Sequence, residues 1–351
     1  MKKFYFIELL RFFTALSVII YHYRHFFKPH SSFSTIDYVV GKSAQPFYSI
    51  LEIFYNYGDY GVPMFWSISG FVFAFVYLEK KESTSGKRFF INRFSRLYPL
   101  HFATLIIVTL LQTISYNFLG SFQIYELNDL YHFFLNLFFI SSWGFEKGIS
   151  FNGPIWSVSV ELVIYFLFFI SIINLNKYNI KFALLVYLLL LALDKTGIDG
   201  GDASAIALFV DCGKLFFSGV LVFYFYSKVK NKFYLIFISI LFIFLSFLGN
   251  FKIFLFFPSV LLLFVGFEIF IHDKLKKPFE FFGNLTYAMY LLHIPVQMLI
   301  ILIFSYLNIF SEIFITGYFF VFYVLMMIIL SFLCYKFYEK PLFNKIRSFS
   351  S

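Results

Sequence analysis

Residues Leu9–Phe27 read LLRFFTALSVIIYHYRHFF, an apolar run that carries Arg11 and His22 inside it. The run is long enough to cross a membrane as a helix, since about 20 residues span a hydrocarbon core. Arg11 and His22 are close to three helical turns apart, so both side chains project from one face, roughly 16 Å apart along the axis. Ionisable groups inside membrane helices are costly. The pair therefore points to chemistry conducted across a membrane.

The composition of the whole chain is that of a polytopic membrane protein. Of the 351 residues, 60% are hydrophobic and 13% are charged, which is about half the charged fraction of soluble domains. Basic cytoplasmic loops account for the net charge of +9, and no nucleic acid is expected as a partner. Cys212 and Cys334 both fall in apolar runs, which argues against a disulfide framework or a thiolate metal site.

The sequence also lacks a metal-binding pattern and a signal-peptide cleavage site. No cluster of His, Asp or Glu recurs at the helical spacing that metal ligands need, so no metal is expected. Glu8 and Arg11 interrupt the first apolar run and no small-residue cleavage site follows, which predicts an uncleaved first helix rather than a signal peptide.

Apolar runs bounded by polar or charged residues predict the membrane helices. They cover residues 7–27, 61–78, 97–118, 130–143, 155–173, 182–193, 204–226, 233–248, 253–271, 285–307 and 313–338. The run 130–143 is short and carries His132 and Asn136. If it spanned the membrane, the acidic loop 194–203 would face the cytoplasm and the charge pattern would break. If it is re-entrant or interfacial, almost all loop Lys and Arg residues fall on the cytoplasmic side, as the positive-inside rule requires.

The second assignment is adopted here. It predicts an all-α polytopic membrane protein with about ten transmembrane helices, one short re-entrant or interfacial helix, and both termini in the cytoplasm. The basic stretch Glu79–Arg96 then lies inside, and the loop with Asp194, Asp199 and Asp202 lies outside. Residues 1–351 are expected to form a single transmembrane domain with no appended soluble domain. The longest non-membrane stretch is the outer loop Lys28–Tyr60.

This orientation sorts the polar groups of the predicted helices into two layers. His22 and Glu161 lie near the outer face, where a carboxylate beside an imidazole orients the ring, a usual arrangement for a general base. The inner layer is cationic and suits a phosphate-bearing ligand that enters from the cytoplasm. Its members are Arg11, Arg93, Arg96, Tyr98, His293, Glu339 and Lys340.

Each of these residues also has a purely structural interpretation. Arg93 and Arg96 fit positive-inside anchors, His22 fits an interfacial residue, and Glu161 fits a buried structural group. Elsewhere, Asp211 and Lys214 lie one turn apart and fit a self-neutralising pair better than a site. The small residues of the second helix would let a ligand or another helix approach closely; they are Gly61, Ser69 and Gly70.

Six patches of sequence, spread in order along nearly the whole chain, resemble the integral-membrane acyltransferase 3 family. This family acylates bacterial surface sugars and related acceptors. The patches are Leu10–Leu16 with His22, which form an Arg-x10-His signature, then Gly58–Phe71, Arg93–Pro99, Asn152–Glu161, Gly283–His293 and Glu339–Pro341.

The resemblance implies a ten-helix enzyme of the bacterial cytoplasmic (inner) membrane. It would transfer an acyl group from acyl-CoA, most often acetyl-CoA, to a surface glycan or lipid-linked sugar, with membrane lipid around it. The important residues of the family carry over onto Arg11, His22, Arg93, Arg96, Glu161 and His293. Together with the layers above, His22, Glu161 and Arg11 are the candidate catalytic residues, and Arg93, Arg96, Tyr98, His293 and Lys340 are the candidate acyl-CoA-binding residues.

Two other functions compete with this one. An exporter of a glycan or an anionic substrate would use the same buried Arg, His and Glu residues, although the sequence lacks obvious inverted repeats and paired broken helices. A purely structural scaffold fits less well, because ionisable residues recur at matched depths on separate helices.

Overall fold

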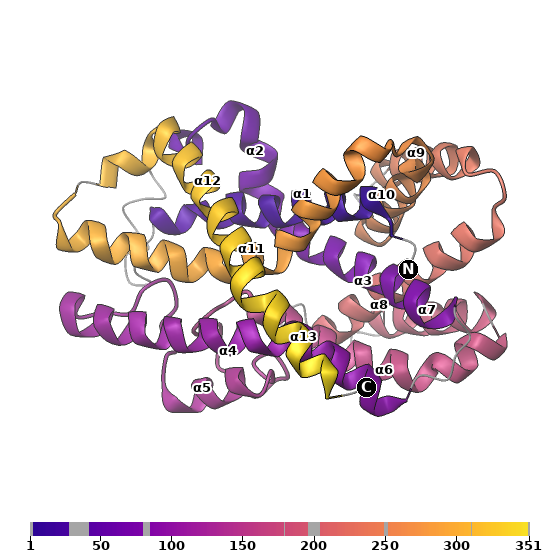
Figure 1. The fold of residues 1–351 in the computed structure, drawn as a ribbon, viewed down its shortest axis with the longest axis horizontal. Coiled ribbons are helices and arrows are strands. Elements are labelled where there is room, and N and C mark those ends of the chain that lie inside the picture. Colours follow the sequence, from indigo (N-terminus) through magenta and orange to yellow (C-terminus); the bar gives the residue numbers. More distant parts are fainter. Residues whose placement is uncertain are drawn as a thin grey trace. The chain divides into compact units, whose positions relative to one another are not determined.

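The computed structural model describes residues 3–27, 42–79, 85–178, 180–195, 204–248, 252–309 and 311–349. Throughout these ranges the regular elements are helices, as Figure 1 shows. The predicted all-α class is therefore confirmed. Part of the predicted orientation depends on residues outside these ranges, namely Lys80, Lys81, Asp199, Asp202 and residues 28–41 of the predicted outer loop.

Thirteen α-helices and six shorter helical turns make up the regular structure of the described residues. In chain order the α-helices are α1 (Tyr5–His22), α2 (Tyr48–Tyr57), α3 (Gly61–Leu78), α4 (Gly86–Leu119), α5 (Leu130–Leu137), α6 (Ile155–Tyr178), α7 (Ile180–Lys195), α8 (Ala205–Lys228), α9 (Phe233–Phe247), α10 (Ile253–Phe267), α11 (Asp273–Tyr306), α12 (Gly317–Cys334) and α13 (Lys340–Ser348). Shorter helical turns are η1 (Tyr23–Phe26), η2 (Lys42–Ala44), η3 (Gly58–Tyr60), η4 (Glu268–Phe270), η5 (Ser311–Ile315) and the π-helical η6 (Tyr335–Glu339).

Eight helical stretches in the described part of the chain are long and apolar enough to cross a membrane. They begin at Tyr5, Tyr48, Gly86, Ile155, Ala205, Ile253, Asp273 and Gly317. The other two predicted spans correspond to α7 and α9, which have 16 and 15 residues and are shorter than the roughly 20 residues that cross a core without tilt or thinning. A multi-pass membrane protein is thus supported, while the count of ten and the cytoplasmic termini stay predictions.

The predicted short helix at 130–143 is α5, with 8 residues. At about 1.5 Å per residue it extends roughly 12 Å, well under half of a hydrocarbon core, so it cannot span a bilayer alone. Its N-terminus is capped by Asp129, whose side chain accepts a hydrogen bond from the backbone N–H of His132. The structure therefore agrees with treating this run as non-spanning.

Three boundaries differ from the sequence prediction. The predicted outer loop contains the helix α2. Its sequence is mostly apolar, but Glu52 and Asn56 break the apolar run, so the run was too short to predict a helix. The helices α4 and α11 each have 34 residues and begin in the basic stretches expected to be loops. Charged residues end an apolar run without ending a helix, since Lys and Arg are good helix formers.

The chain forms two compact units, each assembled from three segments. The first comprises Met1–Thr14, Gly61–Phe89 and Val160–Asn284, and the second comprises Ala15–Tyr60, Phe90–Ser159 and Leu285–Ser351. The helices α1, α4, α6 and α11 supply residues to both units. That all residues belong to a single transmembrane domain stays a prediction.

In the first unit, α3 packs against α8 at very close range. A Cβ atom on Gly70 would overlap the carbonyl oxygen of Phe216, and one on Gly219 would overlap that of Ser67. Glycine is thus required where the two backbones meet. The expectation that small residues of this helix admit a close neighbour is confirmed at Gly70, and the neighbour is another helix.

In the second unit, α4 and α11 share an apolar core with the long connection between α4 and α6. The core side chains are Leu105, Val108, Leu111, Ile124, Phe151, Ile294, Met298 and Leu302. His101 of α4 also donates from Nε2 to the carbonyl oxygen of Asn136 in α5, at 2.8 Å. These contacts hold α11 in place within the second unit, and the candidate site lies beside this helix.

Candidate active site

His22 is the last residue of α1 and belongs to the second unit. Its Nδ1 lies 2.9 Å from the carbonyl oxygen of Val18, one turn earlier. A carbonyl only accepts, so Nδ1 carries the proton in the neutral ring and Nε2 carries the lone pair. This is the tautomer that a general base needs, because Nε2 can take a proton from a hydroxyl.

His293 of α11 lies directly against His22 in the second unit. The two ring centroids are 4.9 Å apart with an interplanar angle of 38°. His293 is fully buried, and its Nδ1 lies 3.3 Å from the carbonyl oxygen of Met289. The sequence analysis placed His293 in the cationic inner layer with Arg93 and Arg96. The structure corrects that placement, because the ring of His293 lies against that of His22, which was assigned to the outer layer.

Two further side chains hold His22 in place. Gln297, one turn after His293 on α11, donates from Nε2 to the carbonyl oxygen of His22 at 2.9 Å. The ring of His25 stacks beside that of His22, with centroids 5.3 Å apart and an angle of 21°. The end of α1 is therefore fixed by α11, and the ring of His22 lies against the rings of two other histidines.

The patch that begins at Asn152 is tied to the same part of α11. Asn152 donates from Nδ2 to the carbonyl oxygen of Leu291 at 2.9 Å. Tyr290 donates from its hydroxyl to the carbonyl oxygen of Pro154 at 3.0 Å, and the same hydroxyl lies 2.8 Å from Oγ of Ser157. Two of the sequence patches, Asn152–Glu161 and Gly283–His293, thus meet beside His22.

Glu161, the predicted partner of His22, lies on α6 and is 9% exposed. Its burial agrees with the expectation of a carboxylate inside the membrane domain. Glu161 belongs to the first unit and His22 to the second, so their pairing stays a prediction.

Arg11 has a partner that the sequence analysis overlooked. Its Nη1 lies 2.9 Å from Oε2 of Glu8, one turn earlier on α1, and both side chains are about a quarter exposed. The spacing of three residues is one at which oppositely charged side chains meet on a helix. Arg11 is therefore part of an ion pair with Glu8 and is not an isolated cation. Its role in the reaction stays a prediction.

The segment with Arg93, Arg96 and Tyr98 lies near the start of α4 in the second unit. Its backbone accepts two hydrogen bonds, one from the patch Gly283–His293 and one from the residue just before the patch Glu339–Pro341. Tyr287 of α11 donates to the carbonyl oxygen of Leu97 at 2.6 Å, and Tyr338 of η6 donates to that of Pro99 at 3.0 Å. Tyr98 itself stacks on Phe94, with centroids 4.6 Å apart. Lys340, which follows η6, is exposed.

Comparison with known proteins agrees with this convergence of patches. A family model described as an acyltransferase domain (Acyl_transf_3) matches residues 4–336, nearly the whole chain. The chain belongs to the acyltransferase 3 family. No curated protein and no solved structure gives a match.

Three partners of the candidate residues that sequence reasoning missed share one feature, which is their spacing. Glu8 lies three residues before Arg11, and Tyr290 and Gln297 lie three before and four after His293. Residues at these spacings share a helix face. Examining the neighbours of each buried ionisable residue at three and four positions would have found all three. Tyr125, which packs against Gly153 and His25, carried no such signal.

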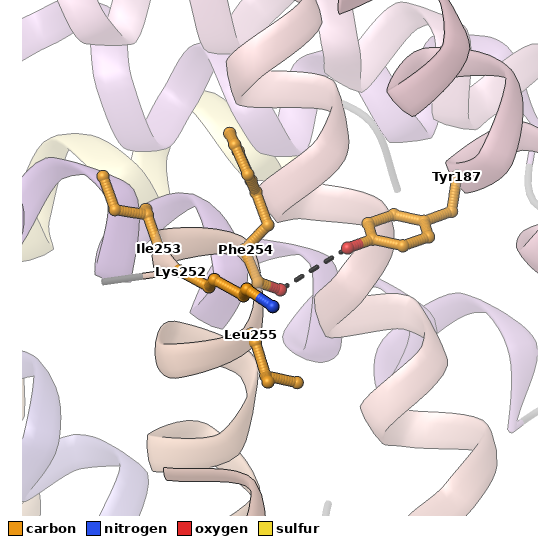
Figure 2. A pocket seen from close by; sticks show the side chains of 5 residues that line it. All are labelled: Tyr187, Lys252, Ile253, Phe254 and Leu255. Carbon is orange, nitrogen blue, oxygen red and sulfur yellow. Dashed lines mark hydrogen bonds between the residues drawn. The ribbon is translucent and has the colours of Figure 1, made fainter. Parts of the chain in front are cut away.

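A separate pocket of the acyltransferase lies in the first unit between α7 and the start of α10 (Figure 2). Its volume is about 360 Å³, and it is lined by Tyr187 and residues Lys252–Leu255. The hydroxyl of Tyr187 donates to the carbonyl oxygen of Phe254 at 3.4 Å, the dashed line in Figure 2. None of the predicted site residues lines it, and its walls are mostly apolar.

Next to this pocket, the predicted Asp211–Lys214 pair is confirmed. Nζ of the fully buried Lys214 lies 2.6 Å from Oδ1 of Asp211. It also lies 2.8 Å from Oδ1 of Asp194 and 3.8 Å from the ring centroid of Phe254. The ion pair joins α7 and α8 and has the character of a structural contact. Within the described residues, no three His, Cys, Asp or Glu side chains are grouped so that they could hold a metal ion.

Proposed function

We propose that this protein is a membrane O-acyltransferase that moves an acetyl or similar acyl group from cytoplasmic acyl-CoA to a hydroxyl of a cell-surface polysaccharide. O-antigen and capsule sugars, or their lipid-linked precursors, are the acceptor class. The family match over residues 4–336 carries this proposal. The membrane helices support placing the enzyme as a multi-pass protein in the bacterial cytoplasmic membrane.

In the proposed reaction, Nε2 of His22 removes the proton from the acceptor hydroxyl. The alkoxide oxygen attacks the thioester carbon of acyl-CoA, and the C–S bond breaks as the tetrahedral intermediate collapses. The CoA thiolate leaves and takes a proton, so that the products are an O-acyl ester and free CoA. Val18 supports this step because its carbonyl oxygen keeps the proton of the neutral ring on Nδ1.

The cationic residues act at the other end of the donor. Arg93 and Arg96 bind the CoA phosphates, since guanidinium groups pair with phosphate oxygens through two parallel hydrogen bonds. Lys340 contributes further positive charge, Arg11 donates the guanidinium N–H groups that its contact with Glu8 through Nη1 leaves over, and Tyr98 packs beside the CoA. Glu161 supports the imidazolium that forms on His22 after proton removal.

The test of this proposal is acyl transfer from radiolabelled acetyl-CoA in membrane vesicles of the producing bacterium. Replacing the general base should lower transfer roughly 10²- to 10⁴-fold, so we expect His22→Ala and Glu161→Ala to abolish labelling of the glycan. His272→Ala is the matched control, because His272 is exposed at the turn before α11. All variants are quantified in the membrane by immunoblot.

Two outcomes would contradict the proposal. Full labelling in both the His22 and the Glu161 variants would show that neither residue carries the chemistry. Movement of a glycan or an anion through the membrane without any label in the product would favour the exporter.

A further inference from the structure

The residues around His22 form a closed circuit of contacts within the second unit. The ring of His22 lies against the rings of both His293 and His25. The ring of His25 meets that of Tyr125, with centroids 6.0 Å apart. Tyr125 packs so tightly on Gly153 that a Cβ there would overlap its ring. Asn152 closes the circuit through its hydrogen bond to α11, two residues before His293.

Two atoms of this circuit are buried acceptors that the described residues leave unsatisfied. They are Nε2 of His293 and Oδ1 of Asn152, on side chains that are 0% and 1% exposed. Nε2 of His293 is an acceptor because Nδ1 of the same ring faces the carbonyl oxygen of Met289. Oδ1 of Asn152 is an acceptor because the amide nitrogen Nδ2 donates to the carbonyl oxygen of Leu291. A buried polar atom without a partner costs stability and needs an explanation, such as a bound water or a ligand.

We propose that Nε2 of His293 and Oδ1 of Asn152 bind hydroxyl groups of the acceptor that neighbour the hydroxyl deprotonated by His22. The acceptor is therefore a neutral sugar with adjacent free hydroxyls. This inference rests on the proposed acyl transfer and adds the chemistry by which the site recognises its acceptor.

The hydrogen-bond acceptors of the site are the reason for proposing a neutral sugar as the acceptor. With Nε2 of His22 as the third member, the circuit offers three acceptors, and a ligand that satisfies them must donate three hydrogen bonds. Sugar hydroxyls do so, whereas a carboxylate or phosphate can only accept. His22 is half-buried and His293 fully buried, so the deprotonated hydroxyl meets His22 and its neighbour reaches further in.

The experiment uses the purified full chain in lipid nanodiscs with acetyl-CoA. Acceptors are octyl glucoside, galactoside and mannoside, the mono-deoxy analogues of whichever is acetylated, and octyl glucuronide as the anionic comparison. Glycan extracted from the producing bacterium is assayed in parallel. Mass spectrometry identifies the acetylated hydroxyl, and kcat/KM is measured for each acceptor.

Three variants separate recognition from structure. His293→Phe keeps a ring and loses the acceptor, and His293→Gln restores an acceptor oxygen. Tyr290→Phe is the matched control, because the hydroxyl of Tyr290 makes its hydrogen bonds with protein atoms of Pro154 and Ser157.

For the wild type, we expect transfer to a neutral glycoside and none to the glucuronide. Removing one hydroxyl beside the acetylated position should lower kcat/KM roughly tenfold, the size expected for one hydrogen bond to a buried acceptor. His293→Phe should lower kcat/KM for the intact glycoside by a similar factor and make it equal to that for the deoxy analogue. His293→Gln should restore part of the difference, and KM for acetyl-CoA should not change.

Several results would overturn this inference. Equal losses on the intact and deoxy acceptors in His293→Phe would indicate that Nε2 of His293 binds only a water. Transfer to the glucuronide would contradict a neutral acceptor. So would transfer to the bacterial glycan but to no neutral glycoside. Transfer to neither the glycan nor any glycoside contradicts the proposed function itself, so the two failures are distinct.

Discussion

At the scale of single residues, Asp129 shows how one carboxylate fixes a short helix. Oδ1 of Asp129 lies 2.8 Å from both the backbone nitrogen and Nδ1 of His132. The backbone hydrogen bond from His132 is the main reason why the pKa of Asp129 lies below its ordinary value of 3.8. A depressed carboxyl pKa stabilises the fold fully above the ordinary value, and this contribution is lost as the pH falls through the depressed one.

We therefore expect Asp129→Ala to destabilise the protein by about 1 kcal/mol at pH 7, the usual cost of losing an N-cap. The difference from the wild type should shrink as the pH falls below the ordinary value of 3.8 and through the depressed pKa of Asp129, because first the unfolded and then the folded carboxylate takes up a proton. Thermal unfolding in detergent at pH 7 and at pH 2.5 measures both values. Glu126→Ala is the control for removing a nearby exposed carboxylate. A difference that stays constant with pH would contradict this account.

Sequence alone predicted the ionisable residues that interrupt apolar runs, because a charge inside a membrane helix is conspicuous. Arg11, His22 and Glu161 were found in this way. Gln297 was not, since a single uncharged polar residue inside an apolar run resembles ordinary core polarity, and Glu8 was noted as a break in the first run but not as the partner of Arg11. Depth was predicted less well than identity, and His293 shows why. A position along an apolar run does not show which residues of another helix lie beside it, and the contact between His293 and His22 is of this tertiary kind.

At the scale of elements, α11 contains a break in its hydrogen bonding that another segment repairs. Pro295 lacks the backbone N–H that would bond to the carbonyl oxygen of Leu291, four residues earlier. Asn152 donates to that same oxygen from Nδ2 at 2.9 Å. A freed carbonyl inside a membrane needs such a partner, because lipid offers none. The proline thereby explains why the loop before α6 docks on α11 beside His293.

This repair predicts a coupling between the two positions. Asn152→Leu should cost about 1–2 kcal/mol of stability, because it leaves the carbonyl of Leu291 unsatisfied. In a Pro295→Ala background the restored N–H satisfies that carbonyl, so the same substitution should cost much less. A double-mutant cycle by thermal unfolding in detergent gives the coupling energy. Additive effects of the two substitutions would show that Asn152 does not compensate for the proline.

The elements themselves were largely predictable, and their ends were not. Apolar runs placed a helix at all ten predicted spans, and the loop charges singled out the run that became α5. The helix α2 and the first turns of α4 and α11 were missed, because charged and polar residues interrupt an apolar run although the helical hydrogen bonds continue through them. The docking of the Asn152 loop on α11 is a tertiary contact, and neither segment signals it alone.

At the scale of the whole molecule, basic residues gather in a few stretches of the chain. They include the first turns of α4, the first turns of α11, and α13. The positive-inside rule predicts that these stretches face the cytoplasm, the side from which acyl-CoA would enter the proposed reaction. The charge distribution thus predicts a direction for the proposed reaction, with the donor entering from the side of Arg93 and Arg96.

That direction predicts sided activity. Acetyl-CoA is too polar to cross a bilayer, so sealed inverted vesicles, whose cytoplasmic face points outward, should transfer label from added acetyl-CoA. Sealed right-side-out vesicles from the same cells should transfer almost none, and permeabilising them should restore activity to the inverted level. The wild type and His22→Ala are compared in all three preparations, so that only labelling that needs His22 is counted. Equal activity in the two sealed preparations would show that the donor enters from the outer face and would reverse the predicted orientation of α1.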